Sequence, residues 1–173
     1  MQTKAVPKGG KASPVRLVHP FPPLYNENSR ILILGSFPSV RSREQRFYYG
    51  HPQNRFWRLL AALFAEDVPG TIEEKKTFIL SHRLALWDSI GSCTIIGSSD
   101  SSIRDAQPND LSSLLQRAPI QKIFCNGSTS FHLYEKHLFP QTGLPAGCLP
   151  STSPANARWT LPMLMEAWHV III

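Results

Sequence analysis

A short apolar run, Ile31-Leu32-Ile33-Leu34, that stops at Gly35-Ser36-Phe37-Pro38-Ser39 constrains the fold more than any other feature of the chain. An apolar run of this length, bounded by glycine and proline, is typical of a buried strand. In open α/β sheets, ligands bind just beyond the carboxyl ends of the strands. The turn that follows Leu34 is therefore the first place to look for chemistry.

Strand-like and helix-like segments alternate along the rest of the chain. Apolar residues recur at helical spacing in several stretches, and shorter apolar runs separate them. This alternation predicts a mostly parallel sheet sandwiched between helices. The expected strands are 30–34, 120–125 and 144–149, with 84–88 as either a strand or an extended connection, and the expected helices are 54–64, 71–82, 109–117, 128–139 and 161–173.

The 173 residues suit one domain. Residues 1–15 contain lysine, glycine and proline and predict a disordered basic tail, so that the domain spans 16–173. The prolines at 20, 22 and 23 indicate an extended segment. Residues 39–53 are expected to form a polar loop. Residues 91–109 are expected to form a long surface connection, and a loop of that length tends to be functional.

The formal charge of +6 is unevenly distributed. Between Ser39 and Trp57, four arginines, which include Arg41 and Arg43, oppose one glutamate, and five aromatic residues lie among or beside them. Basic groups interleaved with aromatic rings suit a polyanion that carries stackable bases. A solvated arginine loop beside a structural aromatic cluster explains the charge equally well.

Several classes of site are disfavoured. The three cysteines are widely spaced and form no C-x-x-C pair, so we expect no metal. The glycine patterns of nucleotide-binding loops and of the serine nucleophile elbow are absent from the sequence. No apolar run approaches the roughly 18 residues of a membrane span, and no secretory signal is visible. A cytoplasmic protein is the expectation.

Three polar segments lie where predicted strands end or a helix begins. Asn54 follows His51-Pro52-Gln53 and could cap the next helix, hold a water molecule, or do both. Asn126 offers a donor and an acceptor that could pair with a base edge, or it could simply begin a turn. Residues 150–156 form either a rigid loop that presses on a nucleic-acid groove or an ordinary connection.

Taken together, these segments resemble the uracil-DNA glycosylase superfamily, and within it the hypoxanthine (deoxyinosine) DNA glycosylase family. The motifs that carry the resemblance are HPFPP at 19–23, GSFPSV at 35–40, FYYGHPQNRFW at 47–57, residues 105–110 and LPSTS at 149–153. They span nearly everything after the tail. Mismatch-specific uracil glycosylases share only the His-Pro-x-Asn-Arg-Phe-Trp core.

The resemblance implies a three-layer α/β/α sandwich around a parallel four-stranded sheet, with no metal and no cofactor. It implies a flipped base held at the strand ends. In the mismatch-specific relatives, an asparagine in the first motif positions the attacking water; here that position is Phe37, so the role passes to Asn54. The resemblance also implies that Tyr49 stacks on the base, that Asn126 reads its edge, and that residues 150–156 enter the duplex.

These arguments predict a monofunctional glycosylase that removes a deaminated base, hypoxanthine above all, from double-stranded DNA. A uracil or broad-specificity enzyme and a non-catalytic DNA-binding module are the alternatives. We expect a monomer that associates with the nucleoid. The predicted site comprises Asn54 as the catalytic residue, a base pocket of Gly35, Ser36, Phe37, Pro38, Tyr49 and Asn126, and DNA contacts at Ser39, Arg41, Arg43, Ser151, Thr152, Ser153 and Pro154.

Overall fold

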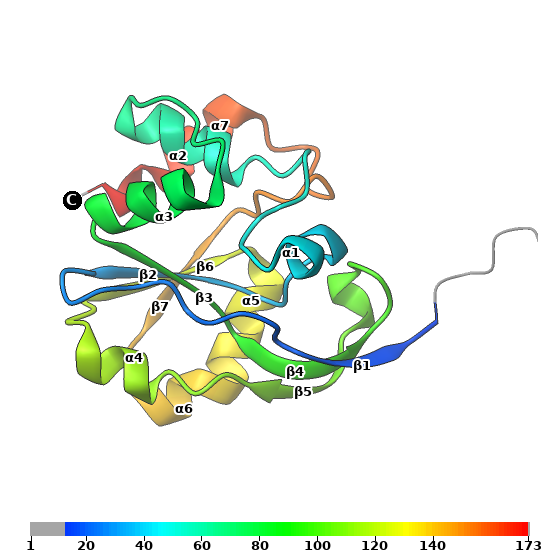
Figure 1. Cartoon of the computed structure of the whole chain (residues 1–173). Helices are drawn as coiled ribbons and strands as arrows, with labels where there is room; N and C mark the ends of the chain where they lie inside the picture. The colour runs from blue at the N-terminus through cyan, green and yellow to red at the C-terminus, as the bar shows by residue number, and fades with distance from the viewer. Residues whose placement is uncertain (1–12, 173) are drawn as a thin grey trace, which may run out of the picture.

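A four-stranded parallel sheet lies at the centre of the protein (Figure 1). The computed structural model describes residues 13–172. The strand order is β3-β2-β6-β7. The strands are β2 (Ile31–Gly35), β3 (Leu84–Asp88), β6 (Lys122–Asn126) and β7 (Ala146–Leu149). The predicted sheet is confirmed, and 84–88 is a full strand rather than an extended connection.

Helices cover both faces of this sheet, which confirms the three-layer sandwich. In Figure 1, α2 (Phe56–Phe64), α3 (Ile72–Ser81) and α7 (Leu161–Trp168) lie above it. Below it lie α4 (Ser112–Arg117), α5 (Ser128–Leu133) and α6 (Phe139–Thr142). A π-helical turn (Tyr134–Leu138) joins α5 to α6, so the run predicted at 128–139 is helical throughout. A 3-10 turn (His169–Ile171) follows α7.

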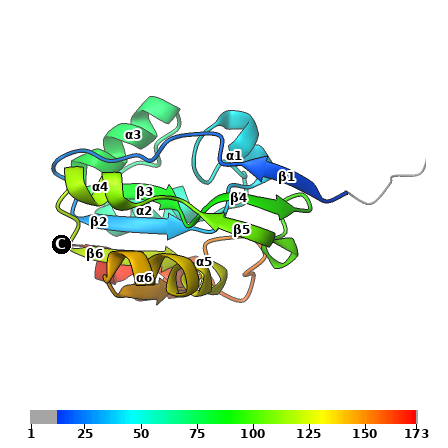
Figure 2. The ribbon, with the colours of Figure 1, turned by 90° about the horizontal axis from the view of Figure 1, so that it is seen from below.

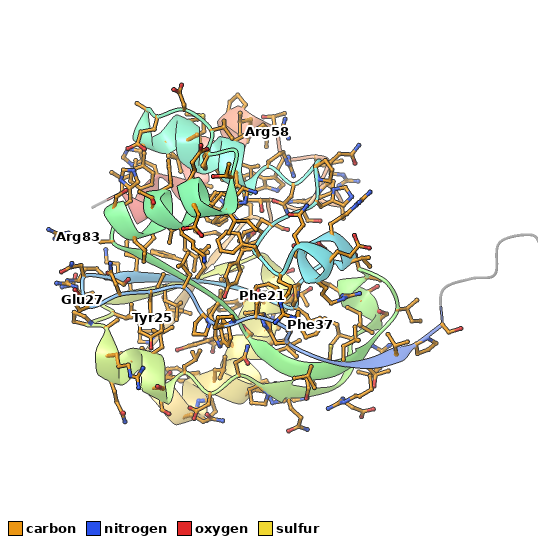
Figure 3. The ribbon with its side chains drawn as sticks, in the orientation of Figure 1. Phe21, Tyr25, Glu27, Phe37, Arg58 and Arg83 are labelled. Atoms are coloured by element: carbon orange, nitrogen blue, oxygen red, sulfur yellow. The ribbon has the colours of Figure 1, made fainter. Side chains whose placement is uncertain are left out.

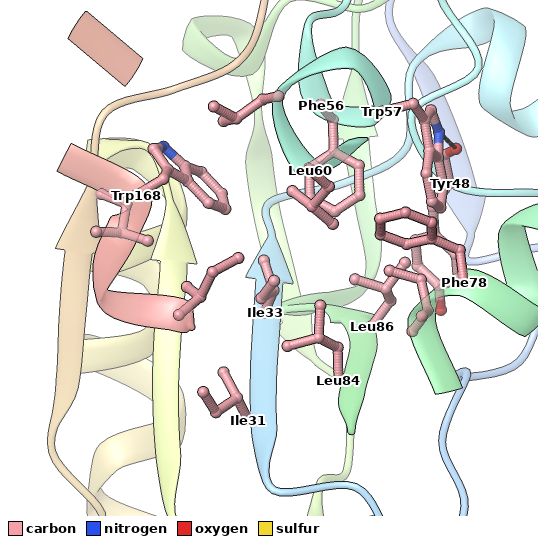
Figure 4. Packing of buried hydrophobic residues seen from close by; sticks show 14 of the residues in the cluster. Ile31, Ile33, Tyr48, Phe56, Trp57, Leu60, Phe78, Leu84, Leu86 and Trp168 are labelled. Atoms are coloured by element: carbon pink, nitrogen blue, oxygen red, sulfur yellow. Dashed lines mark hydrogen bonds between the residues drawn. The ribbon is translucent and has the colours of Figure 1, made fainter. Parts of the chain in front are cut away.

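Alternate side chains of the apolar strand supply two different cores, because successive residues of a strand point to opposite faces. Ile31 and Ile33 pack under α2, α3 and α7, as Figure 4 shows. Leu32 and Leu34 pack on the other side with Tyr134 and Leu138. All four aliphatic side chains of the run are buried. The strand is therefore the shared wall of the two helical layers.

Local signals begin the helices at the predicted places. Thr71 and Glu74 form the predicted capping box, in which each side chain accepts a hydrogen bond from the backbone of the other. Thr160 accepts from the amide of Met163 at the start of α7. Asp110 accepts from the amide of Ser112 before α4. These side chains satisfy amides that a helix start leaves without partners.

The expected long surface connection at 91–109 is wrong, because most of this segment belongs to a second sheet. Strands β4 (Ile90–Ile95) and β5 (Arg104–Pro108) join β1 (Val15–Val18) in an antiparallel sheet of order β1-β4-β5 (Figure 2). Its inward residues Ile90, Cys93 and Ile95 are buried, whereas many of its outward ones are polar. Serine and glycine on the outer positions hid the alternation. Only a short 3-10 turn (Asp100–Ser102) and its flanks remain a connection.

Two further expectations need correction. Residues 40–45 of the predicted polar loop form α1 (Val40–Gln45), which starts where Ser39 accepts a hydrogen bond from the amide of Ser42. Strand β1 begins at Val15, the last residue of the predicted tail. The remainder of the tail prediction, residues 1–12, lies outside the described residues. Within residues 13–172, no helix is both long and apolar enough to cross a membrane.

Shortening a side chain of the central strand should test the shared-wall arrangement. Leu34→Ala removes a fully buried side chain and should lower the free energy of unfolding by about 2–5 kcal/mol, because a cavity remains behind. Val18→Ala, at a position that is 73% exposed, is the control and should change it by less than about 0.5 kcal/mol. Equilibrium denaturation measures both. Equal effects of the two changes would contradict the arrangement.

Candidate active site

A cavity of about 1060 Å³ opens at the carboxyl ends of the parallel strands. Pockets for small ligands usually hold roughly 300–1,000 Å³, so the cavity has room for an extended polar ligand. Its wall combines the turn after β2, the start of α2, the 3-10 turn and the loop after β7. All the polar strand-end segments singled out in the sequence therefore meet at one edge of the sheet. That edge is where the topology of an α/β sheet places its ligand.

A nearly buried part of the wall, the cavity floor, is a close approach between the ends of two neighbouring strands. Gly35 and Asp88 are register partners at the ends of β2 and β3. A Cβ atom added to Gly35 would lie 2.4 Å from Asp88 Oδ1 and 3.3 Å from the Tyr49 hydroxyl. Only glycine leaves space for this carboxylate, which is 4% exposed. Gly35, a predicted pocket residue, therefore contributes to the cavity by leaving room for the Asp88 side chain.

A buried threonine ties three segments of the site together. Thr152 is fully buried, and its hydroxyl accepts from Asn126 Nδ2 at 3.0 Å and donates to Asn54 Oδ1 at 2.9 Å. Its amide also donates to Asn126 Oδ1 at 3.0 Å. Both polar atoms of the Asn126 side chain therefore bind Thr152. This geometry gives Asn126 a structural partner that the sequence did not reveal.

The same contacts fix which way the Asn54 amide faces. Its Oδ1 accepts from the amide of Phe56, the first residue of α2, at 3.0 Å, and from Thr152. A carboxamide oxygen has two lone pairs, so both are used. The N-cap position itself belongs to Arg55, one residue after the predicted one. Asn54 Nδ2 donates to no residue in the described part of the chain. Asn54 lines the cavity, and the group left available to a ligand is a donor.

Arg55 holds the loop after β7 in place. Its guanidinium donates to the carbonyls of Ser153 at 2.9 Å and Asn156 at 3.0 Å, and also to that of Trp159. Its backbone amide donates to the Thr152 carbonyl at 3.1 Å. From the other side, the Trp168 indole donates to the Pro150 carbonyl at 2.9 Å. The loop is thus shaped by contacts to its backbone, which leaves side chains such as Ser151 and Ser153 along the cavity.

Tyr49 lies in the cavity wall with one ring face already covered. Its ring stacks on Phe56, with ring centroids 3.9 Å apart, and its φ of 52° is in the left-handed region. Burial first, and then the charge of Asp88, raise the pKa of the Tyr49 phenol, while hydrogen bonding toward Asn126 opposes the shift. The hydroxyl approaches Asn126 without a well-formed hydrogen bond, and it is left with no partner among the residues described. The phenol stays protonated, and stacking on a base remains a prediction for the ring face opposite Phe56.

The turn residues after Gly35 have separate roles. The Ser36 hydroxyl donates to Asp100 Oδ2 at 2.8 Å. The ring of Phe37 packs with the core of the small sheet while it also lines the cavity. Pro38 lines the cavity too, and its carbonyl accepts from Arg43. Ser39 lines the cavity and caps α1.

Asp100 brings a carboxyl group to the exposed rim of the cavity. Burial of the carboxyl group beside the wall raises its pKa above the ordinary value, the Ser36 hydrogen bond opposes that shift, and the charge of Asp88 adds to it. Asp100 lies in the segment that the sequence left without a role.

The predicted DNA contacts do not form one group. Arg41 is exposed and only pairs loosely with Glu44, at 3.7 Å. Arg43 is partly buried, and its guanidinium donates to the carbonyls of Pro38 and Gly97. Thr152 has no exposed surface with which to contact a phosphate, so its predicted contact is corrected to an internal one. Ser151, Ser153 and Pro154 line the cavity, and their contact with DNA stays a prediction.

Sequence reasoning missed Asp88, His19 and Asp100. His19 Nε2 lies 2.6 Å from Asp88 Oδ2, and both side chains are almost fully buried. Asp88 ends an apolar run, so the rule applied to Gly35 and Asn126 would have selected it had 84–88 been assigned to a strand. His19 lies 69 residues away in sequence, and no local pattern indicates the pairing. No group of three or more metal-binding side chains occurs within residues 13–172.

Comparison with known proteins identifies the family. The family model of the uracil DNA glycosylase superfamily matches residues 22–171. The chain belongs to this superfamily. A relative from Methanosarcina acetivorans named hypoxanthine DNA glycosylase is 39% identical over 141 residues, which cover 81% of this chain and 89% of that protein. One of the same name from Methanosarcina barkeri is 36% identical, with 80% and 87% covered.

The fold of this superfamily member also matches a solved structure. A solution NMR structure of a candidate uracil DNA glycosylase from Methanosarcina acetivorans superimposes with a TM-score of 0.73 and 35% identity. The match covers 87% of this chain and 96% of the other. It extends beyond the central sheet to most of the chain.

Replacing Gly35 should disturb the cavity floor. Gly35→Ala places a methyl group 2.4 Å from a carboxylate oxygen that His19 holds, and such overpacking should destabilise the protein by about 1–3 kcal/mol. Gly70→Ala is the control, because its new Cβ would meet nothing closer than 3.6 Å. Thermal unfolding compares the two variants. A Gly35→Ala protein as stable as Gly70→Ala would show that Asp88 moves aside freely.

Proposed function

We propose that the chain is a monofunctional DNA glycosylase that hydrolyses the N-glycosidic bond of hypoxanthine in double-stranded DNA. The observation that carries the proposal is the strand-end cavity in which Asn54 is held in one orientation. Two relatives that match most of this chain are named hypoxanthine DNA glycosylase, and that name supports hypoxanthine as the base. The proposed reaction needs no cofactor.

In the reaction, a water oxygen bonds to C1′ of the deoxyribose as the C1′–N9 bond breaks. The bonding electron pair leaves with the base, and the water loses a proton to the departing base or to solvent. The sugar gains positive character and the base gains negative charge, so alignment and electrostatic stabilisation can supply most of the rate. No lysine lines the described cavity, so the chemistry proposed stops at hydrolysis without strand cleavage.

We assign the positioning of the water to Asn54. Its Oδ1 is occupied by Phe56 and Thr152, so Nδ2 is the atom that meets the water and donates to the water oxygen. One lone pair of the water then remains for C1′. Such an amide cannot remove a proton, which suits a path in which the C–N bond is largely broken before water attacks. The backbone amides of the turn at 35–37 are assigned to the departing base.

The loop after β7 is the segment proposed to occupy the gap in the duplex. Ser151, Ser153 and Pro154 lie along the cavity, and Arg55 fixes the backbone beneath them. Arg41 on the exposed face of α1 is placed to meet phosphate. Extrusion of a base costs a few kcal/mol, and less for a mispaired base such as hypoxanthine. A preformed loop lowers the cost of holding the extruded state.

Two substitutions separate the catalytic role of Asn54 from its capping role. Asn54→Ser keeps an oxygen that can accept from the Phe56 amide, whereas Asn54→Ala removes it. Both should lower single-turnover excision of hypoxanthine by about 100-fold or more, as loss of a preorganised donor does. Only Asn54→Ala should also lose about 1 kcal/mol of stability. Near wild-type excision by a folded Asn54→Ser protein would leave Asn54 as a cap alone.

A panel of duplexes tests the substrate. Hypoxanthine, uracil and xanthine are each placed opposite the same base, and abasic product is measured with enzyme in excess. The proposal expects the fastest release from the hypoxanthine duplex. Faster release of uracil would make the chain a uracil glycosylase. Binding without product on all three duplexes would make it a non-catalytic DNA-binding module.

A further inference from the structure

The cavity floor contains a buried acid–imidazole pair to which the reaction above gives no role. We propose that Asp88 and His19 determine base specificity: Asp88 Oδ1 accepts the ring N–H of a lactam base, and His19 engages Oδ2 so that a second donor of the base binds it less well. The inference rests on the proposed function, because it takes the cavity to hold an extruded base.

Asp88 lies at the part of the cavity that the base edge farthest from the sugar would reach. It is 4% exposed, lines the cavity and sits against Gly35 at the ends of two adjacent strands. An extruded nucleotide enters base first, with its sugar and phosphates left toward the rim. In a purine, the edge remote from N9 carries C6 and N1. Asp88 Oδ1 accepts no hydrogen bond from any residue between 13 and 172, so it is available to that edge.

The partners of His19 fix the hydrogen positions. His19 Nδ1 lies 2.8 Å from the carbonyl of Phe21, which can only accept, so Nδ1 carries a hydrogen. The 2.6 Å contact between Nε2 and Asp88 Oδ2 requires another hydrogen between them. Whether that hydrogen resides on nitrogen or on oxygen, Oδ1 is left as an acceptor. The pair therefore presents the same face to the cavity in either form.

His19 is held as a rigid support behind Asp88. Its backbone amide donates to the Gly91 carbonyl at 2.7 Å. Its ring contacts Phe21 at 4.5 Å, Trp87 at 4.7 Å and Phe37 at 6.0 Å between centroids. Figure 3 labels Phe21 and Phe37, two of these three rings. The imidazole side chain is 3% exposed, so we assign it a positioning role.

A single acceptor at this place selects lactam bases. Hypoxanthine has a hydrogen on N1 and uracil has one on N3, and either could donate to Oδ1. Adenine and cytosine, their normal precursors, carry a lone pair on the corresponding nitrogen. That lone pair would face a buried acceptor, and both groups would lose hydrogen bonds to water without replacement. A site built for a donor rejects an analogue that lacks it far more strongly than shape alone can.

His19 extends this selection to guanine. Guanine also has a hydrogen on N1, and its N2 amino group lies beside it. These two parallel donors would match both oxygens of an open carboxylate, as paired donors do in bidentate contacts. Oδ2 keeps a second lone pair, but its 2.6 Å contact with the His19 imidazole already draws on its charge and crowds its approach, so the amino group gains less there. Hypoxanthine has only C2–H at that position and loses nothing.

The first measurement needs only the wild-type protein. Duplexes containing hypoxanthine or N1-methylhypoxanthine opposite thymine are compared under single-turnover conditions. Excision of the methylated base should be slower by roughly 100-fold or more, because its N1 cannot donate. Comparable rates for the two bases would overturn the inference, since N1 would then not face an acceptor.

The second measurement removes the acceptor. Asp88→Ala should slow hypoxanthine excision and shrink the ratio between the two bases by about tenfold or more, because neither the acceptor nor its bulk remains. A merely structural role would slow both bases alike and leave the ratio unchanged. That outcome in a folded variant, checked by circular dichroism, would sink the assignment of Asp88.

The third measurement tests His19 with guanine. Hypoxanthine and guanine are each placed opposite thymine, so that both are extruded from a wobble pair. His19→Ala should lower the hypoxanthine-to-guanine ratio by about tenfold or more, and His19→Gln, whose amide can donate to Oδ2, should restore most of it. An unchanged ratio in a folded His19→Ala protein would remove His19 from specificity. If His19→Ala does not fold, His19→Gln is compared with the wild-type protein instead. A folded His19→Gln protein that has lost the wild-type hypoxanthine-to-guanine ratio would then count against the inference.

Failure of the inference and failure of the proposed function look different. If wild-type protein released no hypoxanthine, the proposed function itself would fall. If hypoxanthine were released but the ratios of excision rates between bases did not change in the Asp88 and His19 variants, only the inference would fall.

Discussion

The parallel register of β2 with its neighbours is the constraint from which the site follows. The pairing sets Gly35 beside Asp88 on one side, and β6 and β7 bring Asn126 beside Leu149 on the other. Because all four strands run the same way, their polar ends coincide. A shift of one residue in β3 would turn Asp88 away from the edge and expose Trp87 in its place. The cavity is therefore a property of the sheet first and of its loops second.

The shape of the loop after β7 depends in turn on a few hydrogen bonds to its backbone carbonyl groups. Arg55 binds carbonyls of residues 153, 156 and 159, and Trp168 binds that of residue 150. A guanidinium with several donors in a fixed plane can hold a loop in one shape with little loss of freedom. The arginine beside Asn54 is thus structural, which removes it from the positive surface that the sequence indicated. Arg43 is used in the same way, so the basic patch is smaller than its arginines imply.

The sequence predicted features whose signals lie within a few residues, and it missed contacts between residues that are far apart in the chain. The run 31–34 and the capping box at Thr71 are local, and both were found. The N-cap predicted at Asn54 is one residue early: Asn54 Oδ1 does accept the first helix amide, but Arg55 holds the N-cap position. The small sheet was missed because glycine, serine and threonine separate the few apolar residues of β4, register shifts break their alternation, and β5 is mostly polar. The pairing of His19 with Asp88 and the bridge through Thr152 join residues far apart in the chain. No spacing rule within one segment can show such contacts.

Phe37 shows how the two sheets affect the chemistry. At this position the resemblance to mismatch-specific uracil glycosylases implies an asparagine, whereas here the ring packs with Ile90, Cys93 and Ile95 under the small sheet. The same ring is one of three aromatic rings that pack around the His19 imidazole. An amide in its place would have to bury polar atoms among apolar ones, at a cost of about 1–3 kcal/mol if they stayed unpaired. In this chain the first motif therefore supports the wall of the cavity, and the proposed role of meeting the water falls to the Nδ2 donor of Asn54.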